Sequence, residues 1–256
     1  MQKTRWVVTF ILYLPCPMCV MFYPIIDENC RFAMWTAEHA AVLLFSVLLG
    51  LGLIGLAKYR LTDVQKHRVL NVMGWVISGT VIGWTGIKLY LGIFNLQEDL
   101  PLPLCNAMAL LIPVFTATRN PQLFELLYFW VLAGTFQAII TPDLLDSFPH
   151  YHFLKYWVVH NGLVLVVLYA AIVYQMRPTV AGIGKAFLYL QPYILFCMGV
   201  NYVLGSNYQY LHHKPINGSL LDYMGEWPYY IVSAQLIAVP MFFLVFLPYV
   251  RLKKRL

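Results

Sequence analysis

Charge is the property that this sequence has least of. Only 11% of its 256 residues are charged and 61% are hydrophobic, whereas a soluble domain has about a quarter charged and about half apolar residues. The sequence also has no glycine- and serine-rich linker and no low-complexity tract that would separate a second domain. These absences exclude an ordinary soluble protein. They predict an all-α fold, a polytopic bundle of transmembrane helices.

Other absences narrow the function. No internal repeat with a period of about 20 to 50 residues is visible, which leaves an inverted-repeat transporter without support. The net charge of +6 does not indicate nucleic-acid binding, because the basic residues lie in short connectors and tails beside apolar runs. The histidines at 150, 152, 212 and 213 do not have the spacing of a strong metal site, so we expect neither a metal nor another cofactor.

Seven apolar segments have the length and composition of membrane helices. They cover residues 37–57, 70–91, 103–117, 123–140, 156–174, 186–204 and 229–250. The third is short and contains Pro113, and the glycine-rich run at 48–56 predicts close helix packing. We therefore expect a seven-helix membrane domain at 36–256. Residues 1–35 form an N-terminal leader, which is an eighth span, a signal sequence or an interfacial segment.

The basic residues predict the orientation of the bundle. Lys and Arg cluster at 58–68, at Arg119, at 177–185 and in the tail at 251–256, which are alternate connectors and the C-terminus. Because such clusters stay in the cytoplasm, the C-terminus is predicted to be cytoplasmic. The connectors between these clusters hold most of the acidic residues and are predicted to lie outside.

Polar residues within the predicted spans gather near their outer ends. They are His39, Lys88, Cys105, Asn106, Gln137, His160, Asn161 and Asn201. A charged side chain in the centre of a membrane helix costs about 2.5 to 3.5 kcal/mol, so such residues are expected to face one another or a wet cavity. We expect a shared pocket in which the residues other than Cys105 and His160 bind substrate or donate to an oxyanion. The alternative is that they are helix-end residues that hydrogen-bond to lipid or water.

Cys105 and His160 could form a thiol and imidazole pair. A thiol becomes a useful nucleophile at neutral pH when a base or a cation lies beside it, and histidine supplies either. The predicted chemistry is acyl transfer through a thioester. The alternative is that Cys105 is a small buried hydrophobic residue, since the 55 residues between the two do not establish contact. Lys88, Lys155 or Lys214 could hold a phosphate or act as interfacial anchors.

Several longer motifs carry a family resemblance. "PLCNAMALLIP", "FPHYHFLKYWVVHNGLVL" and "NYVLGSNYQYLHHKP" resemble, in order and spacing, the YwaF-like family of bacterial integral membrane proteins. That family is distantly similar to vertebrate transmembrane protein 164, a membrane acyltransferase that acts on ether phospholipids. The resemblance covers residues 36–249. It implies that Cys105 is the acyl-accepting cysteine and that His160 is the base.

Residues and resemblance together predict a lipid acyltransferase in the cytoplasmic membrane of a bacterium. Its partners are membrane phospholipids, which serve as acyl donor and acceptor, and its active site faces the extracytoplasmic side. If water resolves the thioester, the same site is an acyl hydrolase. The alternative is a non-enzymatic transporter or small-ligand receptor that uses an outward-facing polar pocket. The sequence does not reveal the oligomeric state.

Overall fold

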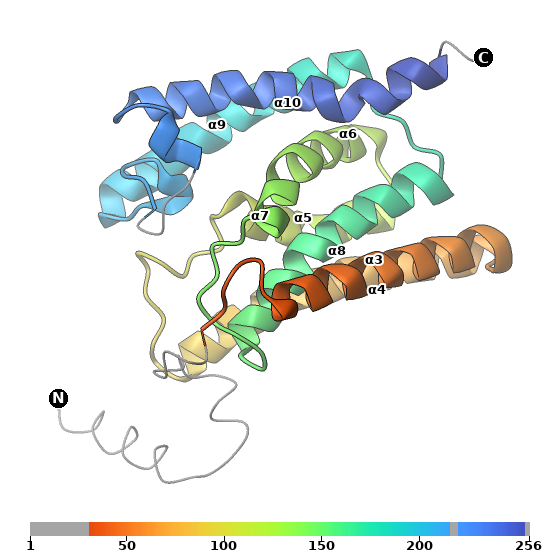
Figure 1. The fold of residues 1–256 in the computed structure, drawn as a ribbon, viewed down its shortest axis with the longest axis horizontal. Coiled ribbons are helices and arrows are strands. Elements are labelled where there is room, and N and C mark those ends of the chain that lie inside the picture. The colour runs from red at the N-terminus through yellow and green to blue at the C-terminus, as the bar shows by residue number, and fades with distance from the viewer. Residues whose placement is uncertain (1–30, 216–219, 254–256) are drawn as a thin grey trace, which may run out of the picture.

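The computed structural model describes residues 31–215 and 220–253, and over these residues the chain is helical, without a β-strand (Figure 1). A π-helical segment, Val131–Thr135, joins α6 to α7, and short 3-10 turns follow α9 at Tyr208–Tyr210 and Leu220–Tyr223. The helices are α3 (Ala37–Arg60), α4 (Asp63–Tyr90), α5 (Leu104–Thr118), α6 (Pro121–Trp130), α7 (Phe136–Ile140), α8 (Tyr151–Val173), α9 (Val180–Leu204) and α10 (Tyr229–Lys253). Residues 1–30 of the predicted leader lie outside the described residues.

All seven predicted helices are present, with α6, the π-helical segment and α7 together forming the fourth. Six of them are long and apolar enough to cross a membrane. The helix α5 is shorter, with 15 residues. The protein is therefore an all-helical integral membrane protein. Six of the seven predicted spans are therefore candidates by length and composition, and the count of seven spans stays a prediction.

The helices lie side by side and their ends gather at two opposite edges of the bundle (Figure 1). The connectors at 61–62, 119–120 and 174–179 are short and lie at one edge, on the right in Figure 1, which we call the basic end. The longer connectors at 91–103 and 141–150, and the described parts of the next connector at 205–215 and 220–228, lie at the opposite edge, which we call the loop end. The long helices α3, α4, α8, α9 and α10 therefore run from one end to the other, and so do α6, the π-helical segment and α7 taken together.

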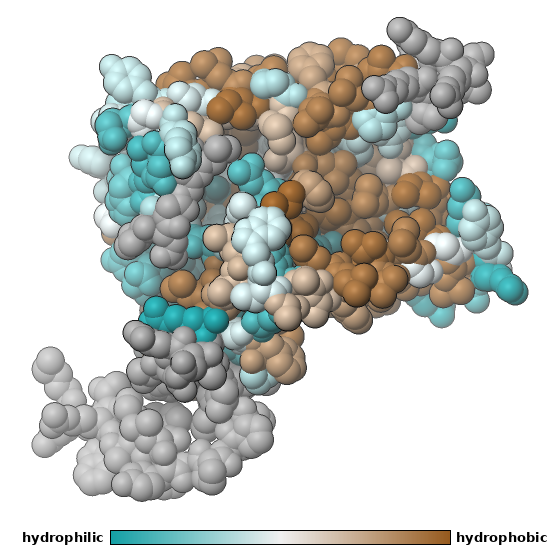
Figure 2. All heavy atoms as spheres, viewed as in Figure 1, coloured by the Kyte–Doolittle hydropathy of each residue, from teal (hydrophilic) through white to brown (hydrophobic). Residues whose placement is uncertain are grey.

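The surface has the polarity expected of a membrane protein. Figure 2 shows a broad apolar band across the middle of the bundle and hydrophilic residues gathered at its two ends. On α3, for example, Leu44, Phe45, Leu48 and Leu51 are exposed to the surroundings. In water such a patch would drive association, whereas in a bilayer it is the surface that contacts lipid chains.

Helix α8 is the centre of the packing, because α3, α4, α5, α6, the π-helical segment and α7 all contact it. Small residues allow the closest approaches. A Cβ at Gly162 of α8 would lie 2.7 Å from Ile77 Cγ1 of α4, and one at Gly74 of α4 would lie 2.5 Å from Thr116 Oγ1 of α5. Side chains larger than glycine would push these helices apart.

The glycine-rich run at 48–56 does not have the predicted role. A Cβ at Gly52 or Gly55 would meet no atom of the described residues within 4 Å, and one at Gly50 would be 3.4 Å from Leu165 Cδ1, an ordinary contact. The prediction of close packing at this run is wrong because α3 turns most of these glycines away from α8. The close approaches occur on α4 and α8 instead.

Helix ends follow local capping chemistry. Thr62 and Gln65 form a reciprocal capping box at the start of α4, which satisfies backbone N–H groups that have no partner within the helix. The Asn120 side chain accepts from two N–H groups of α6, and Pro121 follows it at the first helical position. At the far end of α9, Gly205 adopts a left-handed conformation (φ 65°) and ends the helix.

Candidate active site

Cys105 lies in the first turn of α5 at the loop end. Pro103 precedes the helix and leaves it without a side-chain cap. The segment before it is held by the Leu102 carbonyl, which accepts hydrogen bonds from the Tyr193 hydroxyl and, at 2.8 Å, from Gln209 Nε2. Residue Cys105 is partly exposed, but its thiol lies in an apolar, largely desolvated setting against the core. A thiol at this position also feels the partial positive charge of a helix N-terminus.

The hydrogen-bond partner of the thiol is Thr135. Cys105 Sγ lies 3.5 Å from Thr135 Oγ1, and Thr135 is fully buried. Thr135 is the last residue of the π-helical segment Val131–Thr135. A π-helical turn inserts an extra residue into a helix, and such turns are frequent at functional sites. Here the wide turn carries the hydroxyl group that contacts the thiol.

His160 lies on α8 with its tautomer determined by the helix backbone. Its Nδ1 is 2.7 Å from the Tyr156 carbonyl oxygen, one turn earlier. A carbonyl only accepts hydrogen bonds, so Nδ1 carries the hydrogen and Nε2 of the neutral ring is left with its lone pair. Nε2 has no hydrogen-bond partner among the described residues. It is therefore available as a base.

Tyr156 connects the two candidate catalytic residues. Its ring stacks on that of His160 with 4.0 Å between centroids, and its phenol lies within electrostatic range of the Cys105 thiol. The Tyr156 hydroxyl donates to the Ala138 carbonyl of α7 at 2.8 Å, which holds the ring in place. Helices α5 and α8 pack against each other directly. Thr135 contacts the thiol, Tyr156 lies near it, and His160 stacks on Tyr156; we call these three residues the Cys105 cradle.

The cradle contains the groups needed for a thiol nucleophile. A thiol in an apolar setting stays protonated at rest, so its proton must leave as the sulfur attacks. The unoccupied Nε2 of a neutral histidine accepts such a proton, and a threonine hydroxyl donates to the sulfur when negative charge develops.

His39, predicted as a pocket residue, is instead fully bonded within the protein. Its Nδ1 accepts from the Trp35 backbone N–H at 3.3 Å, and its Nε2 donates to the Ile139 carbonyl at 3.0 Å. The ring is buried against Phe32, Trp35 and Trp157, which we call the His39 cage. Neither nitrogen is available to a substrate in this structure.

Three further predicted residues have separate partners. Lys88 forms an ion pair with Asp99 and lies 5.3 Å from the Trp84 ring centroid. Asn161 donates to Ser46 Oγ of α3 at 2.7 Å. Asn201 is completely buried and binds the turn after α9. Its Nδ2 donates to the Tyr208 carbonyl. Its Oδ1 accepts hydrogen bonds from the Ser206 hydroxyl and from the Tyr208 backbone N–H. The structure thus distributes these residues among separate local networks.

The remaining predicted residues lie near the surface. Asn106 is partly exposed and its side chain makes no hydrogen bond with the described part of the chain, whereas the side chain of Gln137 is exposed. Among the lysines considered as phosphate ligands, Lys214 forms an ion pair in which its Nζ is 3.6 Å from Glu226 Oε1. Lys155, on the same helix as His160, is within ion-pair distance of no carboxylate in residues 31–215 and 220–253. Asn106 and Lys155 thus retain free hydrogen-bonding capacity near the loop end.

His150 of the 141–150 connector and His152 in the first turn of α8 form a polar network with Asp146 at the loop end. His152 Nδ1 lies 2.7 Å from Asp146 Oδ2, and His150 Nδ1 lies 3.6 Å from the same oxygen. Burial raises the pKa of the Asp146 carboxyl, but the His152 hydrogen bond and the charges of His150, His152 and Lys88 more than offset this, so its pKa is below the ordinary value. No group of three metal-ligating residues occurs within the described ranges.

Sequence reasoning missed Thr135 and Tyr156. Tyr156 precedes His160 by four residues, which places both on one helix face, so its spacing was a usable signal. Thr135 had no such signal, because its contact with Cys105 depends on the π-helical turn and on the packing of two helices.

Comparison with known proteins places the chain in a family. The model of the TMEM164 family matches residues 32–246, which include every residue of the Cys105 cradle. The chain belongs to the TMEM164 family. This confirms the distant similarity to transmembrane protein 164 indicated by the loop motifs. A relative described as an uncharacterized protein of Treponema pallidum (strain Nichols) is 28% identical over 188 residues, which cover 72% of this chain and 77% of the relative. No solved structure matches.

Proposed function

We propose that this member of the TMEM164 family is a phospholipid acyltransferase that uses Cys105 as its nucleophile and His160 as its base. The observation that carries the proposal is the Cys105 cradle. One histidine nitrogen is bound to the Tyr156 carbonyl and the other is unoccupied, while the thiol of Cys105, a partly exposed residue on the adjoining helix, is hydrogen-bonded to Thr135. Membership of the family adds weight, because the resemblance implies the same two residues.

The first half-reaction forms a thioester. The thiol proton passes to His160 Nε2 as the sulfur attacks an ester carbonyl carbon of a phospholipid. The tetrahedral intermediate collapses by breaking the bond to the lysophospholipid oxygen, which takes the proton back from Nε2. The products are a lysophospholipid and acyl-Cys105. The Nδ1 hydrogen bond to Tyr156 stays in place and orients the ring throughout.

The second half-reaction releases the acyl chain to another lipid. A hydroxyl group of the acceptor gives its proton to Nε2 and attacks the thioester carbonyl, and the sulfur leaves and regains that proton. Holding two lipids beside the thiol supplies much of the rate, because reaction within one bound assembly replaces a bimolecular encounter. Asn106 and Lys155, which retain unused hydrogen-bonding capacity, are our candidates for contacts with the carbonyl and the phosphate.

The position of Cys105 suits such a substrate. The thiol is in the first turn of α5, directly after the 91–103 connector of the loop end. Phospholipid ester groups lie at the boundary between headgroup and hydrocarbon. The basic end carries the lysine and arginine clusters, so our assignment places the C-terminus in the cytoplasm and the cradle toward the extracytoplasmic side of a bacterial cytoplasmic membrane.

The test is acyl transfer in reconstituted vesicles. The purified chain is supplied with a phospholipid that carries a labelled ester-linked acyl chain and with an unlabelled lysophospholipid, and labelled diacyl product and free fatty acid are quantified. We expect wild-type protein to form the diacyl product and Cys105→Ala to form none. Cys197→Ala is the matched control, because Cys197 is buried on α9 and lacks a histidine partner among the described residues.

The outcomes separate the candidate functions. Labelled fatty acid in place of diacyl product, still dependent on Cys105, would assign the site to acyl hydrolysis. Equal transfer by wild type and Cys105→Ala, or no acyl chemistry by wild type with either acceptor, would contradict the proposal. A small-ligand receptor or transporter would tolerate Cys105→Ala in a binding assay, since a receptor needs no nucleophile.

A further inference from the structure

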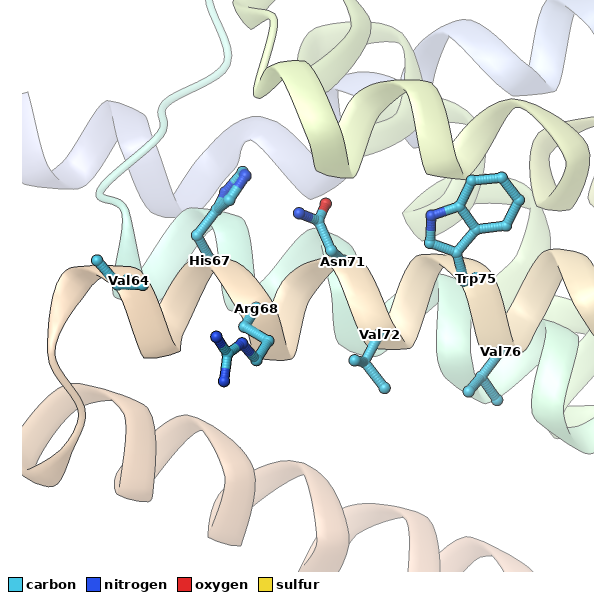
Figure 3. Close-up of a pocket in the computed structure, with 7 residues that line it drawn as sticks. All are labelled: Val64, His67, Arg68, Asn71, Val72, Trp75 and Val76. Atoms are coloured by element: carbon cyan, nitrogen blue, oxygen red, sulfur yellow. The ribbon is translucent and has the colours of Figure 1, made fainter.

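A groove runs along α4 at the basic end, the end of the bundle opposite Cys105. Its volume is about 550 Å³, and the side chains that line it project from α4 alone (Figure 3). Helix α3 packs against α8, and Figure 3 shows it diverging from α4 beyond the short 61–62 connector. The groove is therefore open laterally, toward the hydrocarbon of the membrane.

The lining changes from polar to apolar along the helix. His67, Arg68 and Asn71 lie in the first turns of α4, next to the basic end, and Val72, Trp75 and Val76 follow toward the middle of the bundle. At about 1.5 Å per residue, Arg68 and Val76 are separated by about 12 Å along the helix axis. A phospholipid has the same order of groups, with a charged headgroup followed by an acyl chain.

The polar part of the groove has unused binding capacity. His67 Nδ1 and Asn71 Oδ1 are buried, yet neither has a hydrogen-bond partner in the described structure. Leaving such an atom unsatisfied costs about 1 to 3 kcal/mol, so a partner from outside the chain is favoured. Arg68 is within ion-pair distance of no carboxylate in the described part of the chain, because Asp63, the acid nearest in sequence, pairs with Lys66 at 3.0 Å.

These observations specify the chemistry of the occupant. A guanidinium group binds phosphate through two parallel hydrogen bonds, and an uncompensated arginine makes a plain apolar helix a poor partner for this surface. Val72, Trp75 and Val76 are more than half exposed. Figure 3 shows Trp75 on the flank of α4 that carries His67 and Asn71, and the two valines on the flank that carries Arg68, so the apolar surface between them is of the kind that a lipid chain covers. Basic pockets at the cytoplasmic ends of membrane helices bind anionic headgroups by the same means.

We propose that the α4 groove binds one anionic glycerophospholipid. Its phosphate pairs with Arg68, hydroxyl groups of its headgroup bond to His67 and Asn71, and an acyl chain lies along Val72, Trp75 and Val76. This site is at the opposite end of the bundle from the Cys105 cradle and does not depend on acyl transfer there. It assigns to the protein a lipid ligand that is bound without being consumed.

The first test measures thermal stability of the full chain in detergent. Phosphatidylglycerol and phosphatidylcholine with identical acyl chains are added at equal concentration. We expect phosphatidylglycerol to raise the unfolding temperature by several degrees more than phosphatidylcholine does, and Arg68→Gln to remove at least half of that difference. Arg177→Gln is the matched control, because Arg177 is exposed on the 174–179 connector and its substitution removes the same charge; it should retain the difference.

A second test uses wild-type protein and so does not depend on the folding of a variant. Phosphatidylglycerol with a photoreactive group in its acyl chain is crosslinked in vesicles, and the labelled peptide is identified by mass spectrometry. We expect labelling of residues 64–76, which excess phosphatidylglycerol suppresses at least fivefold more than phosphatidylcholine does. Equal protection by both lipids, labelling outside α4, equal losses in the two arginine variants, or crosslinks between two copies of the chain through this face would overturn the proposal.

Discussion

The His39 cage and the Cys105 cradle use the same kinds of side chain in the same half of the bundle. Each holds a histidine of a membrane helix against aromatic rings. In the cage, both nitrogens of His39 are bonded to backbone groups. In the cradle, one nitrogen of His160 is bonded to Tyr156 and the other has no partner among the described residues.

The comparison gives a physical criterion for separating structural from reactive polar residues in a membrane protein. A polar group whose donors and acceptors are all satisfied contributes to folding, because breaking those bonds in an apolar setting is costly. A group that retains an unused donor or acceptor beside a nucleophile has capacity for a substrate. By this criterion Asn201 belongs with His39, and Thr135 belongs with His160.

Replacing the two histidines should show the largest difference between the cage and the cradle, because one variant should lower activity and the other stability. His160→Gln keeps a polar side chain but removes the base, and general-base catalysis contributes about 10² to 10⁴ in rate. We expect acyl transfer to fall by at least a hundredfold while the unfolding temperature in detergent changes by about 2 °C or less. A fall in stability without a loss of transfer per folded molecule would place His160 with the structural residues.

His39→Ala should have the opposite effect. It leaves the Ile139 carbonyl and the Trp35 N–H without their partner and removes a ring packed on three aromatic side chains. The expected cost is about 2 to 4 kcal/mol of folding free energy, seen as a drop of several degrees in the unfolding temperature. Transfer per folded molecule should stay within about threefold of wild type. A selective loss of transfer at unchanged stability would make His39 part of the site.

Thr135 tests a smaller contribution within the cradle. Thr135→Val has nearly the same shape but lacks the hydroxyl group that contacts Cys105 Sγ at 3.5 Å. One hydrogen bond contributes about 0.5 to 1.5 kcal/mol, so transfer should fall by about 3- to 10-fold. Thr135→Ser, which keeps the hydroxyl, should recover most of the rate. A valine variant that transfers as fast as the serine variant or faster would contradict a role for the hydroxyl group.

Replacing Asp146, a residue of the 141–150 connector beside the His39 cage, should give the smallest change in stability. Its lowered pKa means that it stabilises the folded protein above the unfolded-state pKa, near 3.8, and that this contribution is lost as the pH falls through the folded-state value. Asp146→Asn should therefore lower stability at pH 7 by about 0.5 to 1 kcal/mol, because the carboxyl is half-buried. Thermal unfolding at a series of pH values should show that the stability difference between wild type and Asp146→Asn disappears below about pH 4. A difference that grows as the pH falls would contradict the lowered pKa of Asp146.

The helices were predictable because apolar runs of membrane length have few alternative structures. Their starts were not: α4 begins at Asp63 and not at residue 70, and α8 begins at Tyr151 and not at 156. Apolar composition marks only the part of a helix that lies in hydrocarbon. The capping box of Thr62 and Gln65 extends α4 beyond it into the polar region.

The site was predictable only in part. Residue chemistry and the family resemblance both selected Cys105 and His160, and that assignment stays a prediction. His39 and Asn201 were expected to share a substrate pocket, and the sequence alone could not test this. Their hydrogen-bond partners are mostly backbone groups, which any residue type can supply and which therefore leave no pattern in the sequence. The Ile139 carbonyl that binds His39 is 100 residues away along the chain. The contact of Thr135 with Cys105 likewise depends on a local change of helix type.

The most direct measurement is the covalent state of Cys105. Reconstituted wild-type protein is incubated with a phospholipid donor in the absence of acceptor, digested and analysed by mass spectrometry. The account predicts that the peptide containing Cys105 gains the mass of the donor's acyl chain, that hydroxylamine removes it, and that an added lysophospholipid discharges it. Acyl transfer that proceeds while Cys105 stays unmodified would contradict the account.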